Sequence, residues 1–233
     1  MYKYKKIISV IPARKNSKQI PGKNWKPLNG KPLISYSIEQ SLDSKYIDYT
    51  IVSSDSQDIK EIVHNFQLTN KNLIFVDRPE ELAGDNSPTE DAMIHAIESV
   101  KDIIIPEIVC LLQPTSPSRS KDLIDRCIEK YFQEGANALM TVTQFPPFFV
   151  TGDGLEWFYD PKNRPMRQSI RKEEWFMFDN GNLYLTNVNV LLKTKCRIGD
   201  KLEVFITSEA EGYQIDTPLD FKIMETIMKE MTK

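Results

Sequence analysis

Strand-like and helix-like segments alternate along the first 142 residues of this 233-residue chain. Short apolar runs, typical of buried strands, occupy residues 6–12, 49–54, 73–76, 108–112 and 138–142. Helix-like patterns, with their caps, fill residues 32–42, 58–67, 89–100 and 120–133. This alternation predicts an α/β fold with a doubly wound, mostly parallel sheet. Right-handed crossovers would then bring the strand-end loops to one edge of that sheet.

Proline and hydroxyl residues mark the starts of the expected helices. Pro32 and Pro218 are predicted as first helical residues, because that position does not need an amide hydrogen. Thr89, Ser120 and Thr217 are predicted N-caps, whose hydroxyls can accept a hydrogen bond from the first turn. Three further strands are expected at residues 183–185, 203–206 and 213–216.

Residues 145–180 interrupt the alternation with an irregular, proline-containing stretch. Its aromatic residues are Phe145, Phe148, Phe149, Trp157, Phe158, Tyr159, Trp175, Phe176 and Phe178. A long non-periodic stretch is usually functional or an interface, although the same rings would also fit a satellite core. We find no internal repeat and no low-complexity linker, so we expect one domain, residues 1–233, with an inserted subdomain at about residues 145–180.

Composition limits the compartment and the partners of the chain. No stretch approaches the roughly 18 apolar residues of a membrane span, and the apolar run behind the basic N-terminus is too short for a signal peptide. The three scattered cysteines suggest reduced thiols. We therefore expect a cytoplasmic protein that does not act at a membrane. A net charge of −3 argues against general nucleic-acid binding.

Positive charge is concentrated around the loop that follows the first strand. Every lysine and arginine up to Lys31 comes before the first acid, Glu39. A strand that ends in a loop just before a helix is how open α/β sheets build a ligand crevice. Local positive charge in such a loop suits a compact polyanion such as a triphosphate. On charge alone, a solvated surface loop is the alternative interpretation.

The block from Ile11 to Asn24 resembles the signature of the N-acylneuraminate cytidylyltransferases, also called CMP-sialic acid synthetases. Further blocks that resemble the family follow in order: Ser53-Ser54-Asp55, Arg78 to Ala83, Leu112 to Pro117, Arg167-Gln168, Asn180-Gly181, and Ile215-Asp216-Thr217 with Asp220. The resemblance covers essentially the whole chain. It implies a nucleotide-diphospho-sugar transferase-like fold and an enzyme that joins CTP to a nonulosonic acid, uses Mg²⁺ and releases pyrophosphate. It also implies a homodimer that exchanges an aromatic-rich arm, which residues 145–180 would form.

The resemblance implies a role for individual residues. Arg14 and Lys23 would hold phosphates and Asp216 would hold Mg²⁺, so these three are the predicted catalytic residues. The predicted nucleotide-binding residues are Ala13, Arg14, Asn16, Ser17, Lys18, Lys23, Asn24, Arg78 and Asp85. The predicted sugar-acid residues are Gln113, Thr115, Ser116, Arg167, Gln168 and Asn180.

Two positions depart from the family pattern. Gln19 stands in the phosphate loop where the family usually has glycine, and Gln214 stands where the family commonly has an acid two residues before Asp216. Alternation along a strand would place Gln214 and Asp216 on one face. The predicted metal site is therefore Asp216 with Gln214, one carboxylate and one amide oxygen, completed by phosphate oxygens.

Other interpretations remain open at this point. Asp216 is equally suited to a helix-start acid, and Gln113 at a strand end can simply satisfy a turn. The acceptor could be another sugar acid such as 3-deoxy-manno-octulosonate, and Gln214 invites the alternative of a catalytically silent nucleotide-binding relative. The sequence does not distinguish sialic, legionaminic and pseudaminic acids.

Overall fold

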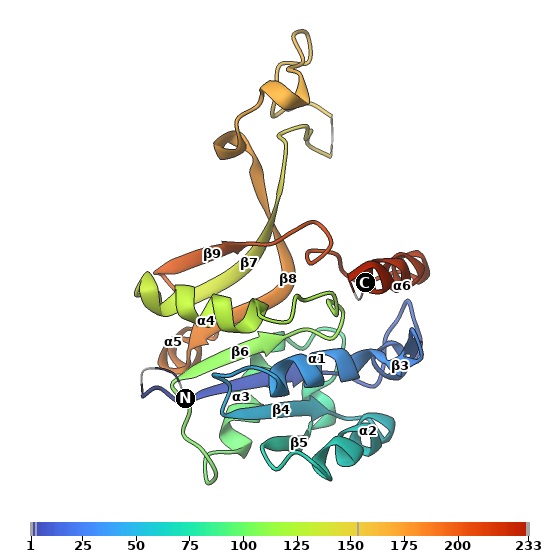
Figure 1. Cartoon of the computed structure of the whole chain (residues 1–233), viewed down its shortest axis with the longest axis vertical. Helices are drawn as coiled ribbons and strands as arrows, with labels where there is room; N and C mark the ends of the chain where they lie inside the picture. Colours follow the sequence, from blue (N-terminus) through green and yellow to red (C-terminus); the bar gives the residue numbers. More distant parts are fainter. Residues whose placement is uncertain (1, 3, 153, 232–233) are drawn as a thin grey trace.

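Seven strands form the central sheet of the computed structural model, which describes residues 2, 4–152 and 154–231 (Figure 1). Their order is β5-β4-β1-β6-β8-β7-β9. Their bounds are β1 (Ile7–Pro12), β4 (Tyr49–Ser54), β5 (Leu73–Asp77), β6 (Ile108–Leu112), β7 (Ala138–Phe145), β8 (Phe176–Asn187) and β9 (Leu202–Ile206). β8 runs antiparallel to β6 and β7, and the remaining pairs are parallel. The predicted α/β fold with a mostly parallel sheet is confirmed.

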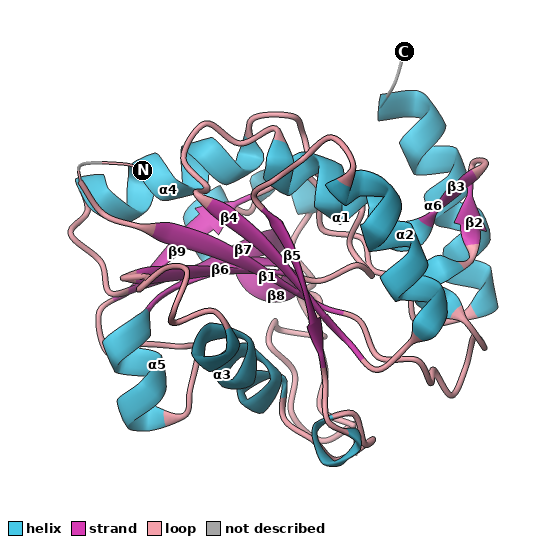
Figure 2. Ribbon diagram, turned by 90° about the horizontal axis from the view of Figure 1, so that it is seen from below, coloured by secondary structure: helices cyan, strands magenta, loops and turns pink. Residues whose placement is uncertain are grey.

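Helices cover both faces of this sheet (Figure 2). α1 (Leu33–Leu42), α2 (Gln57–Gln67) and α4 (Leu123–Gln133) pack on one face, and α3 (Thr89–Ser99) and α5 (Val188–Thr194) pack on the other. Alternation along β1 supplies both cores, because Ile7 and Ile11 face the first set of helices while Ile8 and Val10 face the second. No helix among the described residues is both long and apolar enough to cross a membrane.

A third, smaller core lies beside the sheet under α6 (Pro218–Met231). There Phe221 and Met224 pack against Ile20, Leu28 and Ile215. Leu28 belongs to a short hairpin of β2 (Pro27–Leu28) and β3 (Lys31–Pro32). The C-terminal helix is thereby tied to the loop that follows β1, so residues distant in sequence meet at that edge.

Several predicted element starts are wrong in detail. Pro32 ends the β3 strand, and α1 begins one residue later. Pro88 occupies the cap position of α3, so Thr89 is its first helical residue. Ser120 does not cap α4: its hydroxyl lies 2.6 Å from a Glu211 carboxylate oxygen, and the helix starts only at Leu123. These positions were assigned from local preference, whereas contacts with distant residues decide them.

The C-terminal region contains one confirmed cap and one wrong strand. Thr217 accepts the Asp220 amide at 3.2 Å and its own amide donates to the Asp220 carboxylate at 2.7 Å, so its predicted capping role is confirmed. Residues 213–216 do not form the predicted strand. The Ile215 amide donates to the Thr115 carbonyl at 2.9 Å, which docks the segment on a loop end instead of a strand ladder.

Residues 145–180 form an arm that projects from the body, drawn in yellow and orange in Figure 1. The arm is more regular than predicted, because β7 reaches Phe145 and β8 starts at Phe176, giving it a two-stranded base. Its rings stack edge to face, with 5.2 Å between Phe158 and Phe176 and 5.4 Å between Trp157 and Tyr159. Large apolar side chains nevertheless remain exposed along it, including Leu155, Trp157 and Phe178.

Candidate active site

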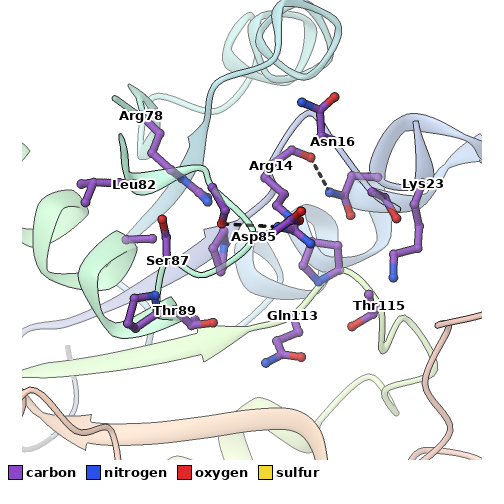
Figure 3. A pocket seen from close by; sticks show the side chains of 17 residues that line it. Arg14, Asn16, Lys23, Arg78, Leu82, Asp85, Ser87, Thr89, Gln113 and Thr115 are labelled. Carbon is purple, nitrogen blue, oxygen red and sulfur yellow. Dashed lines mark hydrogen bonds and ion pairs between the residues drawn. The ribbon is translucent and has the colours of Figure 1, made fainter. Parts of the chain in front are cut away.

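A cavity of about 320 Å³ opens where β1, β5 and β6 end (Figure 3). Loops that follow these three strands supply most of its wall, as expected for the carboxyl edge of a parallel sheet. The predicted residues that line it are Arg14, Asn16, Ser17, Lys23, Asn24, Arg78, Asp85, Gln113 and Thr115. The structure therefore brings most of the predicted nucleotide residues and two predicted sugar-acid residues to one space.

Backbone contacts fix the basic loop above β1. The amide of Ala13 donates to the Ser53 carbonyl at 2.9 Å, which extends the pairing with β4 by one residue. Asn24 is buried, and its amide nitrogen donates to the Arg14 carbonyl at 3.0 Å. Gly22 adopts a φ of +68°, and a β-carbon there would lie 2.9 Å from the Trp25 ring, so the turn requires glycine. These contacts hold Arg14 at the mouth of the cavity.

Two cations of this loop are paired with one acid. A guanidinium nitrogen of Arg14 lies 2.7 Å from one carboxylate oxygen of Asp85 (Figure 3). The Lys18 ammonium lies 2.9 Å from the other carboxylate oxygen. The hydrogen bond from Lys18, aided by Arg14, holds the pKa of Asp85 below its usual range. The Asp85 carboxylate is therefore the internal counterion of both loop cations.

Lys23 is paired with the C-terminal segment. Its ammonium donates to the Ile215 carbonyl at 2.8 Å and lies 3.5 Å from an Asp216 oxygen. The Lys23 side chain is only 13% exposed, and this burial lowers its pKa despite the opposing effect of Asp216. The Asp216 carboxylate is 65% exposed, so it lies at the open side of the pair. Two predicted catalytic residues, Lys23 and Asp216, are thus in contact.

Arg78 is the buried cation of the site. Its guanidinium donates to the Ser53 hydroxyl at 3.1 Å and to the Ser53 carbonyl. Burial lowers the pKa of Arg78 to about 10, which leaves the side chain charged at neutral pH. Leu82, from the short helix η2 (Glu80–Leu82), and Ala92 of α3 add an apolar surface to the cavity wall. This end of the cavity combines one oriented donor group with apolar surface.

The predicted sugar-acid residues fall into two groups. Gln113 and Thr115 line the cavity, whereas Ser116 and Asn180 are fully buried behind it. The Asn180 amide nitrogen donates to Thr143 at 3.0 Å and to Thr207 at 2.8 Å. Its side-chain oxygen accepts from Thr141 at 2.8 Å. The Asn180 side chain therefore ties β8 to β7 and to the segment after β9, and it does not reach the cavity.

Arg167 and Gln168 do not line the cavity. They lie in the 3-10 helix η3 (Arg167–Ser169) of the arm, which projects away from the body (Figure 1). The Arg167 guanidinium lies 5.7 Å from the centre of the Trp175 ring. The two residues therefore lie outside the cavity that a single copy of the chain forms.

The predicted metal pair is only partly assembled. Because residues 213–216 are not a strand, the alternation that placed Gln214 beside Asp216 does not apply. The Gln214 amide nitrogen donates to the Asn180 carbonyl, and a β-carbon at Gly181 would collide with it. No group of three or more His, Cys, Asp or Glu residues in the described part of the chain could hold a metal ion. A single exposed carboxylate, Asp216, still fits Mg²⁺ that takes its other ligands from phosphate and water.

Arg119 has no role in the sequence-based interpretation, yet it lies behind the cavity wall. It is 5% exposed, and one guanidinium nitrogen donates to the Gln113 carbonyl at 2.8 Å and the Asn182 carbonyl at 2.7 Å. Ser87 and Thr89 also line the cavity without having been predicted to do so. The only sequence signal for Arg119 is its place two residues after the block from Leu112 to Pro117.

Known proteins are similar to this chain in sequence and in fold. The chain is 28% identical to the CMP-N,N′-diacetyllegionaminic acid synthase of Legionella pneumophila, over 96% of this chain and 97% of that protein. It is 30% identical to the N-acylneuraminate cytidylyltransferase of Escherichia coli, over 98% of this chain and 53% of that protein. The structure of CMP:2-keto-3-deoxy-manno-octonic acid synthetase complexed with CTP has a TM-score of 0.69 at 17% identity, covering 97% of this chain and 99% of that one.

This structural likeness concerns the fold, whereas the sequence match identifies the family. The cytidylyltransferase family model matches residues 8–215, a range that contains the basic loop and all of the sheet except Ile7, the first residue of β1. The chain therefore belongs to the cytidylyltransferase family and is a nucleotidyltransferase of the acylneuraminate type.

Proposed function

We propose that this chain transfers CMP from CTP to a nonulosonic acid of the sialic, legionaminic or pseudaminic type and releases pyrophosphate. The observation that carries the proposal is the convergence of Arg14, Lys23 and Arg78 on one cavity that Gln113 also lines (Figure 3). Cations around one space suit a triphosphate, and the Gln113 amide offers both a donor and an acceptor to a sugar. The names of two relatives, a legionaminic acid synthase and an acylneuraminate cytidylyltransferase, favour this class of acceptor.

Nucleotide binding exchanges internal ion pairs for phosphate contacts. Arg14 leaves Asp85 and presents its planar fork to phosphate oxygens, while Lys23 acts as a point charge released from Asp216. Arg78, beside the apolar surface of Leu82, orients the nucleoside end. Because the pairs already hold the cations at the cavity, little rearrangement precedes binding.

The transfer itself is a displacement at phosphorus. A hydroxyl oxygen of the sugar acid forms a bond to the α-phosphorus, and the bond from this phosphorus to the oxygen bridging to the β-phosphate breaks. Its electron pair leaves with pyrophosphate, and the hydroxyl proton passes to solvent. Arg14 and Lys23 stabilise the charge on the departing phosphates and hold the reactants in line, which is how most of such catalysis arises.

Mg²⁺ is part of this proposal. When bound, it supplies charge neutralisation at the phosphates. Asp216 would hold it through the exposed carboxylate. Gln214 could contribute its amide oxygen, since the amide nitrogen donates to the Asn180 carbonyl and leaves the oxygen available. A site with one carboxylate binds Mg²⁺ mainly when nucleotide phosphate adds negative charge.

The arm completes the proposal. We propose a single-domain chain in which residues 145–180 are a dimerisation subdomain and two copies pair about a two-fold axis. The exposed apolar side chains of the arm support this, since 79% of Leu155, 52% of Phe158 and 57% of Phe178 is open to solvent. Arg167 and Gln168 would then approach the sugar acid of the partner.

Release of pyrophosphate tests the function directly. The chain is incubated with CTP, Mg²⁺ and one acid at a time: N-acetylneuraminic, legionaminic, pseudaminic or 3-deoxy-manno-octulosonic acid. Turnover with one of the first three supports the proposal, and turnover with the fourth alone would assign a different acceptor. CTP binding with no turnover on any acid would instead favour the silent nucleotide-binding alternative.

A further inference from the structure

Arg119 carries a buried charge with no acid beside it. Its guanidinium donates hydrogen bonds to the Ser37 hydroxyl at 3.0 Å, to the Gln40 side-chain oxygen at 3.1 Å and to two main-chain carbonyls. It forms no ion pair within the described part of the chain. Burial lowers the pKa of Arg119 to about 10, so the group is cationic at neutral pH.

A charge in this position is costly, and neutral side chains of similar size usually stabilise a fold at least as well. The cost points to a geometric task that a guanidinium performs and an apolar side chain does not. Its planar fork of five N–H groups can fix several acceptors at once. The identity of those acceptors shows what is being fixed.

The two carbonyls belong to the point where β6 and β8 separate. The antiparallel ladder ends with Leu112 opposite Leu183, so Gln113 and Asn182 would form the next pair. Instead, both carbonyls accept from one nitrogen of Arg119, at 2.8 and 2.7 Å. The guanidinium therefore sets the distance between the end of β6 and residues 180–182 of β8, where the pairing of β8 with β7 shows a bulge.

Helix α1 holds the guanidinium from the other side. Gln40 accepts from Arg119 and donates its amide nitrogen to the Pro117 carbonyl at 2.8 Å, which fixes the direction of the Gln40 side chain. Ser37 adds a second acceptor one helical turn earlier. Arg119 is thus clamped between a rigid helix and the two strand ends, with little freedom to reorient.

We propose that Arg119 is a positioning residue that acts through Gln113 and the β8 bulge to shape the sugar-acid half of the active site. The proposal rests on the proposed transfer to a sugar acid. Arg119 does not touch the cavity itself; the Gln113 side chain does. The nucleotide half depends on loops after β1 and β5 that Arg119 does not contact. Substitution of Arg119 should therefore weaken binding of the sugar acid more than binding of the nucleotide.

The test compares Arg119→Lys with Arg126→Lys. Lysine keeps the charge at position 119 but cannot hold both carbonyls and both α1 acceptors. We expect the KM for the acid to rise about tenfold or more, with the dissociation constant for CTP unchanged. Arg126 is a matched control, because from α4 it bonds Ser120 and Asp122, which precede that helix, but no residue of the cavity wall. Arg126→Lys should leave both constants as in the wild type.

Amide hydrogen exchange gives a readout that does not need turnover. Residues 113–116 and 181–183 should exchange faster in Arg119→Lys, while residues 8–12 of β1 exchange as before. Unchanged exchange in both segments, or faster exchange with an unchanged KM for the acid, would overturn the proposal. If the wild type turned over no acid, the proposed function would fail and exchange alone would decide the role of Arg119. Should Arg119→Lys not fold, Gln40→Ala is measured in its place with the same expectations.

Discussion

At the scale of single residues, the active site contains its own anions. Arg14 and Lys18 are paired with Asp85, and Lys23 is paired with Asp216. These carboxylates stand beside the cations that the proposed function assigns to phosphate. Because four of these five side chains, all but that of Lys23, are at least a third exposed, the pairs contribute little to stability and can be exchanged when a triphosphate enters.

The first prediction concerns the two phosphate-loop cations. Arg14→Ala and Lys23→Ala should each cost about 2–4 kcal/mol of transition-state stabilisation, measured as kcat/KM for CTP. Arg14→Ala should leave the melting temperature nearly unchanged. Lys23→Ala removes the donor to the Ile215 carbonyl and should also cost about 1 kcal/mol of folding stability. Lys26→Ala is the control, since Lys26 packs over the Phe221 ring; a variant of Arg14 or Lys23 with normal turnover would refute the assigned role.

The second prediction concerns Asp216. Asp216→Ala should abolish Mg²⁺-dependent turnover, because the proposed site offers no second carboxylate to replace it. Gln214→Asp should tighten Mg²⁺ binding by the nucleotide-free protein, but it removes the hydrogen bond that Gln214 donates to the Asn180 carbonyl. Activity and binding are measured against Mg²⁺ concentration. Asp43→Asn, which changes an exposed acid at the end of α1 away from the cavity, should retain the wild-type dependence. An active Asp216→Ala enzyme would place the metal elsewhere.

At the scale of elements, one carboxylate fastens the turn after β9 to the loop before α4. Glu211 is 8% exposed and accepts from the amides and hydroxyls of both Ser120 and Ser208 at 2.6 to 3.2 Å. Burial alone would raise the pKa of Glu211, but these hydrogen bonds outweigh it, so the pKa lies below its usual value. The carboxylate therefore stabilises the fold only while it is ionised.

The third prediction follows from that shift. Glu211→Gln should destabilise the protein by about 1–3 kcal/mol at neutral pH, since a neutral amide cannot accept all four bonds. The pKa of Glu211 is lower in the folded chain than in the unfolded chain. Its contribution is therefore complete above a pH of about 4.3 and is lost as the pH falls through the folded value. Urea unfolding of both proteins over this range measures it. A stability difference that persisted at pH 2 would contradict the prediction.

Apolar periodicity explains which elements could be predicted. β1, β4, β5 and β6 are short apolar runs, and their positions were predicted to within a residue or so. β8 was predicted only at its apolar residues 183–185, because Asp179, Asn180 and Asn182 look like loop residues. Of these, Asn180 and Asn182 are buried, and the Asn180 side chain bonds Thr141, Thr143 and Thr207, which lie far away in sequence. α5 was missed for a related reason, since it has only seven residues and starts at the cap Asn187.

The residues of the candidate site likewise divide into those that a local sequence pattern predicts and those that only contacts between distant segments bring there. Residues of the contiguous loop 11–24 were found because their basic character and order form one recognisable block. The role of Arg119 and the contact of Lys23 with Ile215 were not predicted. Each joins segments that lie far apart in the sequence, so no local pattern indicates the contact. The predicted strand at 213–216 failed because Ile215 is buried under α6, so an apolar residue marked a docking point instead of a strand.

At the scale of the whole molecule, the arm should pair two copies. The fourth prediction is that sedimentation at micromolar concentration shows a dimer and that Phe158→Glu shifts it to monomer, because the variant places a charge in the proposed apolar interface. Leu68→Glu is the matched control: Leu68 is 73% exposed but lies just after α2, on the body. A monomeric wild type, or a monomer produced equally by Leu68→Glu, would refute pairing through the arm.

The last prediction asks whether each arm completes its partner's site. Arg167 lies in the arm and Asp216 beside the cavity, so in the proposed dimer a site would combine Asp216 of one copy with Arg167 of the other. Arg167→Ala and Asp216→Ala should each be nearly inactive as pure dimers. In a mixed dimer, the subunit that carries Arg167→Ala keeps its own Asp216 and receives an intact arm from its partner. Random exchange makes about half of the dimers mixed, each with one whole site, so about a quarter of the wild-type activity should return. A mixture that stayed inactive would show that Arg167 does not act across the dimer.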